Sequence, residues 1–406
     1  MGDVVKIINY LKTNGIKRFF QVLWRYKIEL VLEKIVNMFT KNLKLKNIIL
    51  IESHNDFDCN GGAFYDYLIK NKFNQKYKIV WLVRKRINKR SLPSNVCTVN
   101  LLGPSIKKAY YICMAKYGTF DNDYWNKVRT DQVMIYTTHG SMILKNVKGK
   151  TIIPDYVDYI LVPSKKYAPL LLDQYSIDKD SKKAISIGYP CHDTLFDNNY
   201  EEIKKITCKK YNKVILWMPT FRRGIAYKRN DSIKEQKLGI PLFENIKEFQ
   251  KLNSHLKKNN VLLVLKLHPK QDLSNLKIKT ESNIVVLTGD DVKQLNIDNY
   301  RLLKCTDALI SDYSSISFDY LHLDKPIAYV LDDVNEYKIG FCVDNVNNYL
   351  AGEKIYNYTD LVNFIDNVIN NIDIYQQKRI KLRREIYEFH DDKSCERLAD
   401  FLKLNK

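Results

Sequence analysis

Two histidines of the chain follow apolar, strand-like runs and could therefore take part in proton transfer. His139 stands just after the run 133–137 and is followed by Gly140. His268 directly follows the run 261–267. An imidazole changes its protonation near neutral pH, so a histidine at a strand end can act as a general acid or base. Each histidine alone is also compatible with a turn, a helix cap or a core position. We therefore expect the setting of both residues to decide their role, and we predict that they face each other across one active site.

A basic loop follows another apolar run, at residues 214–218. Thr220 and Arg222 stand in this loop, in the order Pro-Thr-Phe-Arg. The guanidinium of arginine offers a planar fork of donors that fits phosphate oxygens. A solvated basic turn is the alternative, but the position after a strand favours phosphate binding.

A polar turn follows the apolar run 308–310 and leads into a helix that we expect to begin near residue 315. Hydroxyls and backbone N–H groups at a helix start can bind phosphate. Ordinary capping needs only one serine or aspartate, whereas this turn supplies five polar residues in a row. From this turn and the helix that follows it, we predict that Asp312, Ser314, Ser315 and Asp319 bind the phosphate-containing substrate.

The elements that must position these loops alternate as strands and helices from residue 47 onward. This alternation is typical of parallel sheets with helices on both faces. The sequence predicts an α/β chain with two doubly wound parallel-sheet domains, which bind their ligand in the cleft between them. The predicted segments are an amphipathic helical region at 1–46, an acceptor-side domain at 47–196, a nucleotide-donor domain at 213–375 and a C-terminal helix at 376–406.

The composition limits the partners of the protein. The formal net charge is +20, which predicts polyanionic ligands, but no nucleic-acid module is recognisable, so we expect no nucleic acid. The eight cysteines stand singly, as in a reducing compartment. No signal peptide and no bilayer-spanning run is recognisable. These features predict a cytoplasmic protein.

The segment 4–46 combines an aromatic-rich apolar face with many lysines and arginines. This composition is typical of a helix that lies in an anionic membrane interface. The alternative is a helix that packs on its own domain with a solvated basic face. We predict peripheral association with the inner face of the cytoplasmic membrane.

In this order, the four loops resemble those of the CDP-glycerol glycerophosphotransferases of teichoic acid synthesis. The resemblance covers about 350 residues from position 47 onward and departs at Thr138, at Ser141-Met142 and at Cys191-His192, where the family commonly has Arg-Asn. The matching motifs are His139-Gly140, Pro219–Arg222, Leu267–Pro269, Asp312–Asp319, Gly188–Pro190 with Asp193, Asp324–Pro326, Tyr337 with Gly340-Phe341, Phe389 with Asp391–Ser394 and Arg397, and, more loosely, Glu52-Ser53 with Gly61-Gly62.

The resemblance implies a GT-B-like fold and transfer of a polyol phosphate from CDP-glycerol or CDP-ribitol to a hydroxyl of a lipid-linked or polymeric anionic acceptor. It implies His139 as general base and His268 as a phosphate ligand, with Gly140, Thr220 and the residues named above around the donor. The alternative for Asp312 or Asp319 is that one of them orients His268 or the ribose. We expect no metal and no cofactor other than the donor substrate, since no Asp-x-Asp stands in a strand-end loop. The alternatives are a GT-B glycosyltransferase that uses a nucleotide sugar for capsular polysaccharide and a non-catalytic membrane-associated scaffold.

Overall fold

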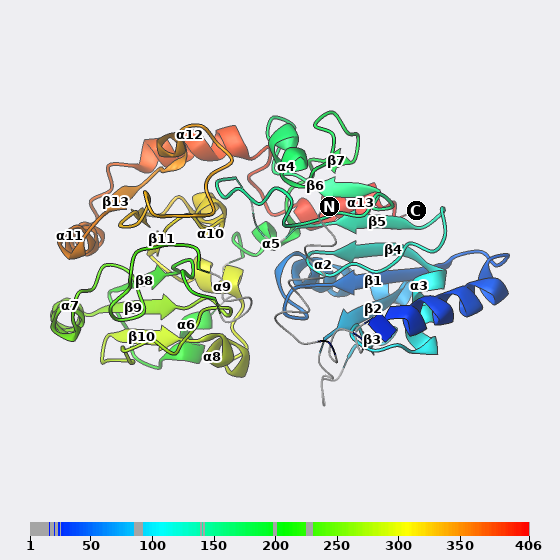
Figure 1. The fold of residues 1–406 in the computed structure, drawn as a ribbon, viewed down its shortest axis with the longest axis horizontal. Coiled ribbons are helices and arrows are strands. Elements are labelled where there is room, and N and C mark those ends of the chain that lie inside the picture. Colours follow the sequence, from blue (N-terminus) through cyan, green and yellow to red (C-terminus); the bar gives the residue numbers. More distant parts are fainter. Residues whose placement is uncertain are drawn as a thin grey trace.

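The computed structural model describes residues 16, 20, 23, 24, 26–84, 92–138, 140, 143–197, 201–224 and 230–405. Two separate parallel sheets lie side by side, with helices on their faces (Figure 1). Every pairing between named strands is parallel. The predicted fold class, two doubly wound α/β domains, is therefore confirmed.

The N-terminal sheet has seven strands in the order β3-β2-β1-β4-β5-β6-β7. Its inner strands are buried along most of their length, which explains their continuous apolar runs. The strands are β1 Lys46–Glu52, β2 Lys78–Val83, β3 Val96–Asn100, β4 Ala115–Phe120, β5 Val133–Tyr136, β6 Tyr159–Leu161 and β7 Ala184–Ile185.

The central strand of this sheet, β4, was not predicted from the sequence. This strand follows α3 Ile106–Met114 with no loop between them, so its first residue read as the end of the helix. Its Gly118 makes room for the ring of Trp125, which would lie 2.5 Å from a Cβ at that position. Because this strand contains a glycine where a neighbouring ring packs, its sequence does not read as a continuous apolar run.

The helices of the N-terminal half cover this sheet and connect its strands. They are α2 Cys59–Lys70, η1 Phe73–Gln75, α3 Ile106–Met114, α4 Ala168–Gln174 and α5 Pro190–Asp193. The stretch 197–212, which lies between the two predicted domains, contains α6 Glu202–Ile206, and this helix contacts α9 Asn299–Lys304 of the second half.

The C-terminal sheet has six strands in the order β10-β9-β8-β11-β12-β13. The short edge strand β13 was not predicted, because only three residues pair there. The strands are β8 Lys213–Trp217, β9 Val261–Lys266, β10 Ile284–Leu287, β11 Ala308–Ser311, β12 Ile327–Val330 and β13 Glu353–Ile355.

Two helices follow β10, α8 Gly289–Gln294 and α9 Asn299–Lys304. Asn296 between them has a φ of +49°, a left-handed conformation that ends a helix. The other helices of this half are α7 Ile246–Lys258, α10 Ile316–Asp319, η3 Tyr320–Leu323 and η4 Val346–Tyr349.

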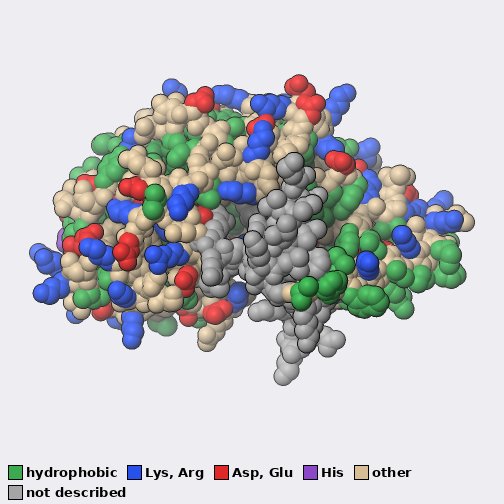
Figure 2. All heavy atoms as spheres, in the orientation of Figure 1, with side chains coloured by type: hydrophobic (Ala, Val, Ile, Leu, Met, Phe, Trp, Pro, Cys, Tyr) green, Lys and Arg blue, Asp and Glu red, His purple; other side chains and the backbone are tan. Residues whose placement is uncertain are grey.

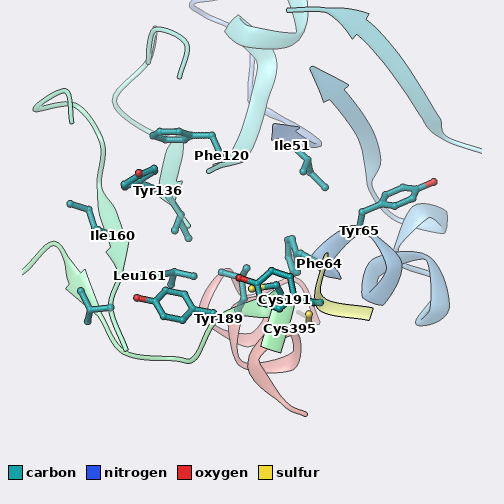
Figure 3. Close-up of a cluster of buried hydrophobic side chains, with 14 of the residues drawn as sticks. Ile51, Phe64, Tyr65, Phe120, Tyr136, Ile160, Leu161, Tyr189, Cys191 and Cys395 are labelled. Carbon is teal, nitrogen blue, oxygen red and sulfur yellow. The ribbon is translucent and has the colours of Figure 1, made fainter. Parts of the chain in front are cut away.

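The C-terminal segment consists of α11 Tyr358–Ile369, α12 Gln376–Ile386 and α13 Ser394–Phe401. The last of these returns to the N-terminal half, where the carboxylate of Asp193 accepts the N–H groups of Ser394 and Cys395 at 2.9 and 2.8 Å. Figure 3 shows Cys395 beside Phe64 and Cys191 in the core of the N-terminal half. The chain therefore crosses between the two halves twice.

Residues 26–40 form a helix before β1, and the rest of the predicted amphipathic segment up to residue 25 lies largely outside the described residues. The polar side of the helix at 26–40 faces the N-terminal half of the protein. Glu29 binds Lys108 at 2.6 Å, and Asn126 donates to Glu33 at 3.0 Å. Large apolar side chains of this helix are exposed instead, as the group at the right of Figure 2 shows. No helix among the described residues has the length and apolar character needed to span a bilayer.

Candidate active site

Loops from both halves meet where the strands of the two sheets end. Gly140 has a φ of +92°, and a Cβ at this position would lie 2.6 Å from Oγ of Ser315. Nζ of Lys145 lies 3.1 Å from Oγ1 of Thr220. His139 itself lies outside the described residues. Gly140 and Lys145, which follow His139 in the chain, nevertheless lie against Ser315 and Thr220 of the second half.

Backbone pairing holds the same segment to the second half. The N–H of Asn146 donates to the carbonyl of Gly340 at 3.1 Å, and the N–H of Cys342 donates to the carbonyl of Leu144 at 2.8 Å. Hydrogen bonds of this kind fix the distance between the two halves at the site.

Thr220, Arg222, Asp312 and Asp333 form a buried group that we call the arginine network. The carboxylate of Asp312 accepts the N–H of Thr220 at 2.8 Å and Nη1 of Arg222 at 2.9 Å, and it also accepts the hydroxyl of Thr220. Asp333 accepts Nε and Nη2 of Arg222 at 2.5 and 2.9 Å. The exposed fraction of Arg222 is 3 %.

The charges of this network compensate one another. Burial opposes the charge on Arg222, but Asp312 and Asp333 outweigh burial and raise the pKa of the guanidinium. For the same reason the pKa of Asp333 is lowered despite its burial. In this structure Arg222 holds its own loop to β11 and to the turn after β12, so direct phosphate binding by Arg222 stays a prediction.

His268 lies at the end of β9, with its ring centroid 4.7 Å from that of Phe221. Its Nδ1 accepts the N–H of Lys270 at 3.0 Å. Burial, followed by the nearby charge of Lys145, lowers the pKa of His268 to about 3. A neutral ring whose Nδ1 accepts a hydrogen bond carries its proton on Nε2. His268 is therefore arranged as a hydrogen-bond donor, which fits contact with a phosphate oxygen.

The two serines of the predicted turn remain available for a ligand. Ser314 and Ser315 are partly exposed, and Ser315 precedes α10 without capping it through its side chain. No hydrogen bond joins either hydroxyl to another of the described residues. They stay predicted donor ligands.

Asp319, the last residue of the predicted donor set, is a buried contact between the two halves. Its carboxylate lies 3.0 Å from Nε2 of His192 and accepts the hydroxyls of Tyr300 and Tyr387 at 3.0 and 3.3 Å. His192 belongs to α5 of the N-terminal half and is one of the residues by which the sequence departs from the motif pattern. The departure places an imidazole where it bonds to Asp319, so this carboxylate holds the two halves together.

The sequence analysis missed two residues near His268. His54 follows β1 and Lys266 ends β9, and both influence the charge of His268. The signal for Lys266 was present in the sequence, because a lysine interrupts the otherwise apolar run 261–267. A charge in a fully buried strand needs a reason. Nothing in the sequence marked His54, because it is distant from His268 along the chain and only the folded structure brings the two near each other.

The comparison with known proteins decides the family. The family model for CDP-glycerol:poly(glycerophosphate) glycerophosphotransferases matches residues 34–404. The chain belongs to this family. It is therefore a transferase of the glycerophosphotransferase type, as predicted, and the nucleotide-sugar alternative is not favoured.

Curated relatives agree with the family. The chain is 25% identical over 392 residues to the teichoic acid poly(glycerol phosphate) polymerase of Bacillus spizizenii W23, covering 90% of this chain and 91% of the relative. It is 26% identical over 372 residues to the teichoic acid glycerol-phosphate primase of Bacillus subtilis 168, covering 85% and 89%.

A solved relative shows the same fold. The wall teichoic acid polymerase TagF superposes with a TM-score of 0.69 at 20% identity, covering 96% of this chain and 98% of that chain. The GT-B-like architecture expected from the sequence is therefore confirmed over nearly the whole chain.

Proposed function

We propose that the protein transfers a polyol phosphate, most simply glycerol phosphate from CDP-glycerol, to a hydroxyl of a teichoic acid chain or its lipid-linked precursor. The names of the curated relatives support this donor and acceptor class. The observation that carries the proposal is the meeting of Gly140 and Lys145 from one half with Thr220, Ser315 and the neutral His268 of the other.

The reaction needs a base on one side of the cleft and a group that accepts negative charge on the other. The acceptor hydroxyl attacks the β-phosphorus, a new phosphorus–oxygen bond forms, and the hydroxyl proton passes to His139. The bond between the β-phosphorus and the bridging oxygen breaks, and CMP leaves with that oxygen. Donors placed at the leaving phosphate offset the charge that develops there.

Nε2–H of His268 and the hydroxyls of Ser314 and Ser315 are the proposed donors to the pyrophosphate. Thr220, Arg222 and Asp312 set the loop that carries Phe221, which packs on the imidazole. We propose no metal and no further cofactor for this step. Asp319 then acts through its bond to His192 and not through the donor.

A donor panel tests the reaction. The full-length protein incubated with an acceptor oligomer should release CMP from CDP-glycerol or CDP-ribitol and no nucleotide from nucleotide sugars. His139→Ala should abolish CMP release without loss of fold, whereas His255→Gln on α7 should leave turnover unchanged. Near-normal turnover by His139→Ala would contradict the assigned base, and turnover of a nucleotide sugar alone would contradict the donor class.

The helix at 26–40 supports a second element of the proposal, association with an anionic membrane. The exposed fractions of Val31, Met38 and Phe39 are 53, 61 and 74 %, whereas Glu33 on the other side is 6 % exposed. This is the reverse of a helix that buries its apolar face in its own domain. An outward apolar face with lysines beside it fits an interfacial helix.

Vesicle binding tests this association. Vesicles with anionic phospholipid should sediment the protein, and the double variant Met38→Ser/Phe39→Ser should reduce the bound fraction several-fold. Ile374→Ser is the matched control, because Ile374 is 79 % exposed but lies before α12. Equal vesicle binding by the double variant and the parent would contradict the proposal.

A further inference from the structure

Lys266 is a buried cation of the C-terminal sheet. It is the last residue of β9 and is 5 % exposed. Among the described residues, no hydrogen bond or ion pair reaches its ammonium group. The carboxylates of Asp298 and Asp58 attract it from farther away.

The strand places Lys266 on the same face as His268. Side chains alternate along β9, so Leu263 and Leu265 pack into the core against α7 and α11, while Leu262 and Val264 pack on the other side. Lys266 continues the second row, and His268 is the next residue in that row. Burial lowers the pKa of His268 most, and the charges of Lys145, Lys270 and Lys266 lower it further.

An ammonium that is so little exposed and makes no bond among the described residues is expected to be poorly solvated. Burial of a charge that makes no hydrogen bond opposes folding, and replacement of such a charge by an apolar side chain is often neutral or stabilising. Burial also lowers the pKa of Lys266 to about 8, so the group is still mainly protonated at neutral pH. Its three N–H groups can therefore donate hydrogen bonds to an anion.

A compensating role is the structural alternative. If Lys266 served to balance Asp58 and Asp298, contact with one of these carboxylates would be expected, and none is present. Asp298 instead accepts the N–H of Arg301 as the cap of α9. Burial raises the pKa of Asp298, although the N–H and the charge of Arg301 lower it.

We propose that Lys266 binds the phosphate that leaves with the nucleotide, beside Nε2–H of His268. The inference rests on the proposed function for the identity of the donor. When the bond between the β-phosphorus and the bridging oxygen breaks, its electron pair stays on that oxygen. The ammonium of Lys266 offsets this charge and gives up no proton.

Ligand binding by the full chain tests the role. CMP and inorganic pyrophosphate are the probes, measured by calorimetry and by the shift in thermal unfolding. Lys266→Met should weaken binding of both by about ten- to a hundred-fold, the usual effect of one charged hydrogen-bonding group. Lys266→Arg should keep part of the affinity, and Lys258→Met at the exposed end of α7 should keep all of it.

Two further readouts separate a ligand from a structural residue. Without ligand, Lys266→Met should be at least as stable as the parent, whereas a counter-charge for Asp58 and Asp298 would leave the variant less stable. The affinity of the parent for CMP should fall as the pH rises through about 8, because the protonated form binds, and the affinity of Lys266→Arg should not. Unchanged CMP affinity in Lys266→Met would overturn the proposal.

The same variants distinguish the inference from the proposed function. If no CDP-polyol is turned over but pyrophosphate binding still depends on Lys266, the anion site stands and the donor assignment is wrong. If CDP-glycerol is turned over with equal KM and kcat by the parent and by Lys266→Met, the reaction stands and the role of Lys266 is wrong.

Discussion

Two groups of charged residues stand at neighbouring strand ends of the C-terminal sheet and differ in how their charges are matched. In the arginine network, Arg222 makes ion pairs with Asp312 and Asp333 and is completely buried. At the end of β9, no carboxylate among the described residues makes an ion pair with Lys266, and the imidazole of His268 keeps a donor. A network that satisfies itself positions a loop, whereas donors without partners are available to a ligand. Residue type alone does not distinguish these two roles.

The largest expected effect is on stability in the arginine network. Arg222→Met leaves two buried carboxylates without their partner, so the free energy of unfolding should fall by about 3–5 kcal/mol. Urea unfolding of the protein without ligand measures this difference. Lys266→Met is the matched comparison, because it removes a buried cation that no carboxylate contacts. If Arg222→Met keeps its stability and only raises KM for the donor, Arg222 is a ligand and the contrast between the two groups is wrong.

A smaller effect concerns the pH dependence of stability at His268. Its pKa is about 3 in the folded chain and 6.5 in the reference state, so the unfolded chain binds a proton between these values that the folded chain does not. The free energy of unfolding should therefore fall as the pH is lowered from about 6.5 towards 3, by at most about 1.4 kcal/mol per pH unit from this group.

His268→Gln should make this acid loss less steep, as measured by urea unfolding at several pH values. His255→Gln should serve as the control, because His255 lies on the partly exposed face of α7. An unchanged slope in His268→Gln would mean that the ring is not held in its neutral form.

The smallest expected effect is at the contact between the network and the N-terminal half. Thr220→Val removes a hydroxyl that bonds to Asp312 and lies 3.1 Å from Nζ of Lys145. We expect a loss of about 1 kcal/mol in the free energy of unfolding, since one hydrogen bond is removed and the backbone N–H of the same residue still bonds to Asp312. A loss as large as that of Arg222→Met would show that the hydroxyl, and not the guanidinium, holds the network.

Much of the fold could be read from the sequence, because strands buried on both faces must be apolar along their whole length. The elements that escaped prediction lack this signal. The central strand β4 contains Gly118 and follows a helix directly, β13 is only three residues long, and Asn296 breaks a helix that the apolar spacing suggested was continuous. In each case the fold determines the element, and the apolar pattern of the local sequence does not indicate it.

By itself, the sequence determined the two parallel sheets, the family and the loops that carry the chemistry, since these depend on apolar runs and on motifs at their ends. Only the tertiary structure decided which motif residues face inward. It shows Arg222 and Asp319 bound to partners distant in sequence, and it shows no hydrogen bond or ion pair to Lys266 from the part of the chain that it describes. The physical reason is that the number of bonds a charged group makes depends on groups that the fold brings from elsewhere, and spacing along the chain does not record them.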